Sequence, residues 1–387
     1  MLDLSERPVV DSHCHAFLPE KETSPFEQYL NLADNPVPKA DATSTLLYRH
    51  VVRELSRVMD FRGTHEEVVE ERTRRYRRDP AGHIGLLFED AKIETLMVDT
   101  GYPAKLFSGY SIDLEEFGRM VPSGVREIFR VDIVLYELVK NLVPFDTAVE
   151  EFHDRMRDAV RGGAVALKSV VAYRTGLEMQ RHEEEEVRSA YEELTAESRS
   201  GKHVRSILSG RSRHAKIAYD HFVFLAVEES TRLGVPFQIH TGMGDSPGID
   251  LRVANPILLR ELLNDAALKD ARIVLVHGGY PYVEEAGFLV STYPNVFMDL
   301  SEAIPFAGVG VREKLVGLMA MAPTTKLMYG SDGFNVPELH WFSAIHAKRS
   351  LSAALGELLE SGDVDEGWAR EATERFLSGN AKRIYGL

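Results

Sequence analysis

The chain has 387 residues, of which 44% are hydrophobic and 27% charged, so it has enough apolar material for a sizeable core. Its formal net charge of −15 argues against nucleic acid or an anionic membrane as a partner, because both require a basic surface. The single cysteine excludes an internal disulfide and a cysteine-rich zinc site. With neither a secretory signal nor an apolar run of membrane-spanning length in the sequence, we expect a cytoplasmic protein.

The first expected strand covers residues 9–17 and carries two histidines, His13 and His15, separated by one residue. Side chains alternate between the faces of a strand, so both imidazoles point the same way and Cys14 points the other way. Two imidazoles at that spacing can bind one divalent ion. Taken alone the pattern is a weak signal, because two ordinary polar residues would give it too.

A long polar section, residues 18–83, follows without a strong strand pattern. Residues 44–58 and 66–78 place apolar residues at helical spacing among charges, which predicts helices. A section of this length between two strands is more than a connection. We therefore expect an inserted helical cap over one end of the fold.

Strands and helices alternate along the rest of the chain. The further expected strands cover residues 95–99, 127–134, 164–172, 236–240, 272–277, 296–300 and 326–332. The expected helical segments cover residues 146–161, 183–233, 258–265, 282–293, 311–321, 339–360 and 365–384. Apolar strands joined through helices indicate a parallel sheet that is buried on both faces.

Eight such strands are the number that closes a barrel. We predict an α/β protein with a (β/α)8 TIM barrel, helical insertions after strands 1 and 4, and a single domain over residues 1–387. The rival fold is an open doubly wound sheet. That fold would normally carry a glycine-rich phosphate-binding turn after its first strand, and this sequence has none there.

Ligand-type residues stand at the C-terminal ends of four expected strands. His13 and His15 end the first strand, His240 the fifth, His277 the sixth and Asp332 the eighth. In a barrel these ends converge on one mouth, where active sites lie. The five residues together therefore predict a metal centre, although any one histidine alone would more simply be structural.

At these positions the chain resembles the amidohydrolase superfamily of metal-dependent barrel hydrolases, in particular its amidohydrolase-2 branch. The resemblance runs from Asp11-Ser-His-Cys-His through His240, His277 and Gly330-Ser-Asp to the ending 376–387, and omits residues 18–83. The stretch from Lys168 and the residues after His240 are also similar to the barrel that is fused to a glutamine-synthetase-like domain in nodulin-like proteins. We expect the barrel alone.

The resemblance implies one or two divalent ions, with Zn²⁺ expected, although imidazole and carboxylate also suit Mn, Fe and Ni. Binuclear members often carry a CO2-carboxylated lysine on strand four, where Lys168 lies. Such a lysine would bridge two ions, with His13, His15 and Asp332 on one and His240 and His277 on the other. The alternative is a single ion held by His13, His15, His240 and Asp332, with His277 polarising the substrate and Lys168 remaining an ammonium.

Other residues are candidates for the substrate pocket. Tyr173 and Arg174 follow strand four, and an arginine there suits a substrate carboxylate through paired hydrogen bonds. A structural ion pair for Arg174 is an equal alternative. Glu302 after strand seven and His340 after strand eight either line the pocket or support it.

The predicted reaction is hydrolysis of an amide-type C–N bond in a small carboxylate-bearing substrate, for instance a glutamyl amide, by metal-activated water. Asp332 would take the proton of the water and pass it to the amine, and His277 would hold a metal or the oxyanion. The alternative is a metal-dependent, non-oxidative decarboxylase of an unsaturated or aromatic acid. A third interpretation is a non-catalytic barrel that acts as a binding or scaffold protein, which a purified chain without metal would favour. The expected partner is a small-molecule substrate, and the sequence leaves the oligomeric state open, although such barrels often pair.

Overall fold

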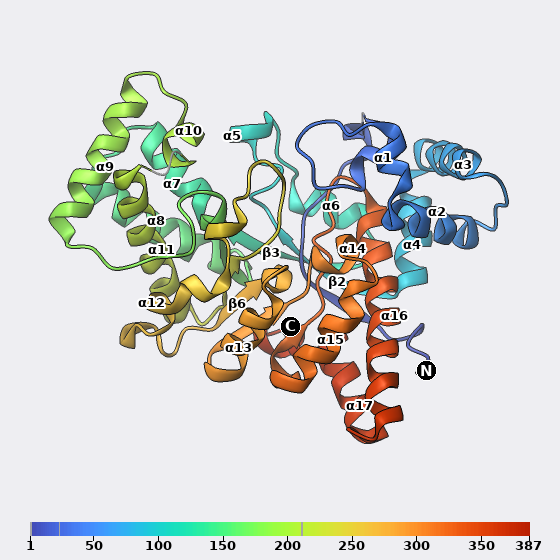
Figure 1. The fold of residues 1–387 in the computed structure, drawn as a ribbon. Coiled ribbons are helices and arrows are strands. Elements are labelled where there is room, and N and C mark those ends of the chain that lie inside the picture. The colour runs from blue at the N-terminus through green and yellow to red at the C-terminus, as the bar shows by residue number, and fades with distance from the viewer. Residues whose placement is uncertain (1, 23, 210–211) are drawn as a thin grey trace. The chain divides into compact units, whose positions relative to one another are not determined.

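The computed structural model describes residues 2–22, 24–209 and 212–387 (Figure 1). The chain divides into two compact units. Unit 1 comprises Met1–Arg126, Gly244–Pro247 and Asp299–Leu387, and unit 2 comprises Glu127–Met243 and Gly248–Met298.

Eight parallel strands of the described residues form one sheet in the order β1 to β8, with helices between them, so the (β/α)8 barrel is confirmed. The strands are β1 (Val9–Cys14), β2 (Ile93–Asp99), β3 (Gly124–Arg130), β4 (Ala166–Ser169), β5 (Phe237–His240), β6 (Ile273–Val276), β7 (Val296–Asp299) and β8 (Leu327–Met328). Every residue of β1 and of β4 to β8 is buried. Coverage on both faces explains why these strands are apolar without alternation.

In unit 1, β1 pairs in parallel with β2, with Val10 opposite Thr95. The amide of Ser12 also donates to the carbonyl of Tyr329 (3.2 Å), so the segment that follows β8 lies beside β1. The helices of this unit are α1 (Lys39–Ser44), α2 (Leu46–Val58), α3 (His65–Arg78), α4 (Pro80–Ala91), α5 (Lys105–Ser108), α6 (Leu114–Met120), α14 (Ala303–Phe306), α15 (Gly310–Met321), α16 (Pro337–Ser361), α17 (Glu366–Glu374) and α18 (Asn380–Tyr385).

Residues 18–83 do contain helices, as expected. Helix α3 begins with a capping box, in which the Thr64 hydroxyl accepts from the Glu67 amide and the Glu67 carboxylate accepts from the Thr64 amide. Helix α2 begins at Thr45, whose hydroxyl accepts from the amide of Tyr48 (3.1 Å). In unit 1, α2 and α4 pack against α16. That these helices form a cap over the barrel mouth stays a prediction.

A buried cluster of charges joins the inserted helices to α16. Arg72 of α3 donates to both carboxylate oxygens of Glu338, with Nε–Oε1 and Nη2–Oε2 distances of 2.6 and 2.7 Å. It also pairs with Glu22, and His83 of α4 lies 2.7 Å from Glu338 Oε1. Because Glu338 stands in the first turn of α16, shortly after Asp332, the cluster anchors the inserted helices to the segment that carries Asp332.

In unit 2, the strands from β3 to β7 pair in parallel with their sequence neighbours, with Leu167 opposite Phe237 and Phe237 opposite Ile273. Its helices are α7 (Val131–Lys140), α8 (Phe145–Arg161), α9 (Glu184–Arg199), α10 (Val204–Ser209), α11 (Arg213–Leu233), α12 (Arg260–Leu263) and α13 (Val283–Thr292). The long helix α11 packs against α8 and α9.

The structure corrects some strand boundaries. The third expected strand extended over residues 127–134, but β3 ends at Arg130 and α7 begins at Val131. The apolar residues Val131, Val134 and Leu135 are buried at helical spacing, so they continue the helical pattern and not the strand. The fourth and eighth strands are also shorter than predicted, ending at Ser169 and Met328.

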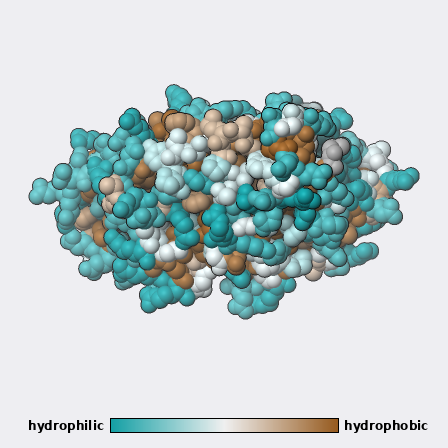
Figure 2. Space-filling model, turned by 90° about the horizontal axis from the view of Figure 1, so that it is seen from below, coloured by the Kyte–Doolittle hydropathy of each residue, from teal (hydrophilic) through white to brown (hydrophobic). Residues whose placement is uncertain are grey.

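Hydrophilic residues cover most of the face drawn in Figure 2, and hydrophobic residues form only small patches there. This distribution agrees with an interior that takes up most of the apolar side chains. Among the residues described, the helices lack the combination of length and apolar character that crossing a membrane requires.

Candidate metal centre

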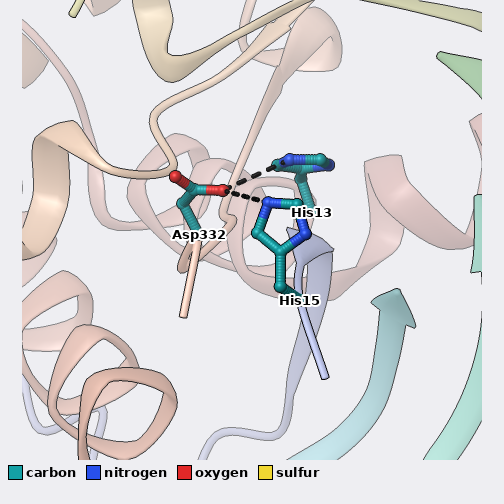
Figure 3. Close-up of side chains that lie close together, drawn as sticks. All are labelled: His13, His15 and Asp332. Atoms are coloured by element: carbon teal, nitrogen blue, oxygen red, sulfur yellow. Dashed lines mark ion pairs between the residues drawn. The ribbon is translucent and has the colours of Figure 1, made fainter. Parts of the chain in front are cut away.

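Three predicted ligands meet in unit 1. His13 lies in β1, His15 directly after it, and Asp332 in the loop after β8 (Figure 3). The Oδ1 atom of Asp332 is 3.2 Å from His13 Nε2 and 3.4 Å from His15 Nε2. All three side chains are buried. Two imidazole nitrogens and one carboxylate oxygen therefore converge on a single point away from bulk water.

Asp11 holds the two segments of this site together. Its Oδ1 accepts from the amides of Ser331 (2.8 Å) and His13 (3.3 Å), and its Oδ2 accepts from the Ser331 hydroxyl (2.5 Å). Burial raises the pKa of Asp11 to about 7, because the hydrogen bonds from Ser331 offset only part of the desolvation. Asp11 thus fixes the backbone on both sides of the ligands, since Ser331 precedes Asp332.

Backbone contacts complete the alignment of the ligands. The amide of Asp332 donates to the carbonyl of His13, and the amide of His15 donates to the carbonyl of Gly333, each at 2.8 Å. The ring of His340 donates from Nε2 to the His15 carbonyl (3.0 Å), and burial lowers the pKa of His340 to about 4. A Cβ at position 333 would collide with the His340 ring, which explains the glycine there. His340 therefore supports the site through its hydrogen bond to the backbone of His15.

The ring of His15 indicates that a cation belongs at this point. Its Nδ1 lies 3.2 Å from the carbonyl oxygen of Asp99 and must carry a proton to donate to it. In the neutral ring, Nε2 then presents a lone pair to the carboxylate of Asp332. Facing lone pairs repel unless a positive charge lies between them, and one divalent ion satisfies all three ligand atoms at once. The donor set therefore fits a divalent metal.

A second pair of predicted ligands lies in unit 2. The ring centroids of His240 and His277 are 4.4 Å apart, and the ring of Tyr173 lies 4.5 Å from that of His240. His240 Nε2 donates to the carbonyl of Met243 (2.8 Å), which leaves the lone pair on Nδ1. A ring oriented by a backbone carbonyl in this way is common among metal ligands.

The loops that carry these two histidines are joined directly. The amide of Met243 donates to the carbonyl of Tyr280 (2.6 Å), and the amide of Gly242 to that of Ala254 (2.7 Å). Gly242 has φ +75°, and a Cβ there would collide with the backbone of Gly279 and Tyr280. The close approach of the two loops depends on this glycine.

We expect Gly242→Ala to lower the free energy of unfolding by about 3 kcal/mol, from the left-handed backbone plus the backbone collision. Gly234→Ala is the matched control, since Gly234 has φ +71° and open space around its missing Cβ. That variant should lose only about 1 kcal/mol. Urea denaturation of both variants measures the difference, and equal losses would contradict the packing described.

The remaining predicted residues are placed as follows. Lys168 is buried in β4, paired in register with Gln238 of β5. Glu302 is buried in unit 1 at the start of α14, and its amide donates to the carbonyl of Ser331 (3.3 Å). Arg174 is partly buried in unit 2, in the loop after β4. The structure thus presents the ligands as two sets, one in each unit, and their union in one centre is a proposal.

Three candidate residues share an unusual backbone conformation. His277, Glu302 and Asp332 have φ values of +69°, +58° and +49°, which non-glycine residues rarely adopt. Such strain tends to persist at functional sites, where the surroundings enforce it. Sequence reasoning missed both this strain and the role of Asp11, although the Asp-Ser-His-x-His pattern placed Asp11 next to the ligands.

Fold and donor set together define the class of the protein, a metal-dependent barrel enzyme. The chain belongs to the amidohydrolase family, whose model, described as Amidohydrolase, matches residues 141–387. It is 26% identical to Protein fluG of Emericella nidulans over 414 aligned residues, which cover 99% of this chain and 46% of that protein. The chain therefore spans about half the length of this curated relative.

Solved structures show the same fold. A proposed metal-dependent hydrolase from Lactobacillus casei is 24% identical with a TM-score of 0.84, over 100% of this chain and 98% of that one. A uronate isomerase from Thermotoga maritima is 16% identical with a TM-score of 0.68, over 99% and 95% of the two chains. Since a hydrolase and an isomerase both share this fold, the reaction has to be argued from the residues.

Proposed function

We propose that the protein is a metal-dependent hydrolase that cleaves an amide-type C–N bond in a small carboxylate-bearing substrate. The observation that carries the proposal is the buried convergence of His13 Nε2, His15 Nε2 and Asp332 Oδ1. Because the C-terminal strand ends of (β/α)8 barrels generally meet at one mouth, we assign His240 and His277 to the same centre.

When bound, a divalent ion such as Zn²⁺ supplies water that is nucleophilic at neutral pH and polarises a carbonyl oxygen. The chain offers five ligands for it: His13, His15, His240, His277 and Asp332. In the two-ion version Lys168, carboxylated by CO2, would supply a further anionic ligand. In the one-ion version Lys168 is an ammonium and His277 faces the substrate.

We assign Asp332 the role of general base. Its Oδ1 faces the two imidazoles, so we assign Oδ2 to take the proton of the attacking water and to return it to the leaving amine. In the one-ion version a ring N–H of His277 donates to the oxyanion that develops on the carbonyl. We place Tyr173, Arg174 and Glu302 around the substrate, with the guanidinium of Arg174 binding its carboxylate.

Metal removal tests this proposal. We expect the protein to hold one or two ions per chain by elemental analysis when it is prepared with CO2, and one ion would exclude the version bridged by Lys168. Chelation should abolish release of amine from a panel of glutamyl amides, and Zn²⁺ should restore it.

His13→Ala should lose the metal, whereas His203→Ala, which changes an exposed histidine, should retain it. A wild-type protein without bound metal would contradict the proposal and favour a binding role. Release of CO2 without amine from an unsaturated or aromatic acid would favour the decarboxylase alternative.

A further inference from the structure

Arg174 carries an incompletely satisfied charge inside unit 2. Its Nε atom is inaccessible to solvent and has no hydrogen-bond partner among the described residues. It also forms no ion pair with a carboxylate in the part of the chain that the structure describes. A buried N–H of this kind is costly unless something binds to it, and a guanidinium is a bidentate receptor for carboxylates.

Two phenols link Arg174 to a buried carboxylate. Tyr219 Oη lies 3.2 Å from Asp132 Oδ1 and 2.9 Å from Tyr136 Oη, and the guanidinium of Arg174 lies against the ring of Tyr136. The carboxylate oxygen Oδ1 of Asp132 accepts from the hydroxyl of Tyr219, whose oxygen is also within hydrogen-bond distance of the Tyr136 hydroxyl. Asp132, Tyr219 and Tyr136 thus form a hydrogen-bonded chain that ends beside the guanidinium of Arg174.

The carboxylate itself is held in place from β4. Asp132 Oδ2 accepts from the amide of Val170 (3.0 Å), and its Oδ1 accepts from the hydroxyl of Ser169 (3.3 Å). Burial raises the pKa of Asp132, while Arg130 and Arg174 act in the opposite direction. Val170 and Ser169 lie in the segment that leads to Arg174, so the same backbone positions both ends of the chain of bonds.

This arrangement keeps Arg174 charged without occupying its binding edge. Burial alone would lower the pKa of Arg174, but the influence of Tyr136, Tyr219 and Asp132 outweighs it and raises that pKa above its ordinary value. A direct Asp–Arg pair would instead cover the paired N–H groups that a ligand carboxylate needs. Tyr136 and Tyr219 lie between Asp132 and Arg174, so Asp132 favours the charged guanidinium without pairing with it directly.

The guanidinium also lies close to the histidine pair of unit 2. Its Cζ atom is 5.6 Å from the ring centroid of Tyr136 and 5.9 Å from that of Tyr173. Tyr173 in turn lies next to His240, with their ring centroids 4.5 Å apart. A carboxylate bound by Arg174 would thus lie one aromatic ring away from His240.

We propose that Asp132, Tyr219 and Tyr136 are positioning residues that hold Arg174 as the receptor for a substrate carboxylate. The inference deepens the proposed function and rests on it: it assigns the substrates to carboxylic acids with a second, reactive carbonyl group. Arg174 contacts the substrate, and the other three act through Arg174.

Glutarate is a suitable probe, because it carries the carboxylate without a bond to cleave, and glutaramide is its neutral counterpart. We expect calorimetric titration of the metal-free protein to show glutarate bound at least about tenfold more tightly than glutaramide. Arg174→Met should abolish this preference. Tyr219→Phe should weaken glutarate binding about tenfold and leave the weak binding of glutaramide unchanged.

Tyr191→Phe is the matched control in the same unit, because the Tyr191 hydroxyl is buried and has no hydrogen-bond partner in the described residues. It should leave glutarate binding unchanged. The proposal is overturned if the wild-type protein binds glutaramide as tightly as glutarate, or if Tyr219→Phe behaves like Tyr191→Phe. The second comparison decides even where Arg174→Met fails to fold.

Binding to the metal-free protein requires neither hydrolysis nor a metal. Failure of C–N cleavage with an intact preference for glutarate would therefore remove the proposed reaction and keep the carboxylate receptor. Loss of the preference for glutarate with intact cleavage of amides would remove the carboxylate receptor and keep the proposed reaction.

Discussion

Asp332→Asn should lower the turnover of an amide substrate by about 1000-fold or more while leaving the fold intact. Asparagine keeps the shape of the side chain and an oxygen toward the imidazoles, but it cannot take a proton from water. It also tolerates the left-handed φ of +49° at this position better than most residues. We expect most of the metal to remain, so kcat, metal content and Tm should be measured on the same preparation.

Asp60→Asn is the matched control for this experiment. Asp60 also has a positive φ, of +47°, but its side chain is exposed and lies outside the predicted ligand set. It should turn over substrate at the wild-type rate. A near-normal rate for Asp332→Asn would remove the proton-transfer role and leave Asp332 as a ligand only.

Glu338→Gln should lower the free energy of unfolding by about 4 kcal/mol, because it leaves the buried guanidinium of Arg72 without its bidentate partner. The exposed pair of Glu115 with Arg119 provides the control, and Glu115→Gln should change stability far less than Glu338→Gln. Urea denaturation at neutral pH compares the two. Equal small effects would show that the cluster does not anchor the inserted helices.

The pH dependence of the same cluster follows from its charges. Burial alone would raise the pKa of Glu338, but Arg72 and His83 outweigh it and lower that pKa from 4.5 to about 2. The carboxyl group of Glu338 therefore ionises more readily in the folded protein than in the unfolded chain. The stabilisation of the fold by this ionised carboxylate is complete above pH 4.5. It is lost as the pH falls from 4.5 toward 2. The difference in stability between wild type and Glu338→Gln should shrink over that interval.

Strand periodicity was enough to place His13 and His15 on one face, because side chains alternate with a strict period of two. The eight-strand count and the buried apolar runs were enough for the barrel. The apolar runs also placed His240 at the last residue of β5 and His277 directly after β6. These features are local, so a single segment of sequence contains them.

Features that depend on distant segments had no such signal. The carbonyl of Asp99 that orients His15 comes from β2, and any residue could supply that carbonyl. Tyr219 and Asp132 lie on α11 and α7, where the sequence shows them only as helical residues. The left-handed backbone at Asp332 follows from the packing around it and not from its residue type. The helix start at Val131 was missed because β-branched residues suit a strand as well.

A crystal structure of the metal-loaded protein, with anomalous data at the metal absorption edge, tests the shared centre most directly. We predict an anomalous peak within about 2.0–2.2 Å of the Nε2 atoms of His13 and His15 and of a carboxylate oxygen of Asp332. His240 should bind this ion or a second one next to it. A peak at the His13–His15–Asp332 site with His240 and His277 distant from any ion, or no peak there at all, would contradict the proposed centre.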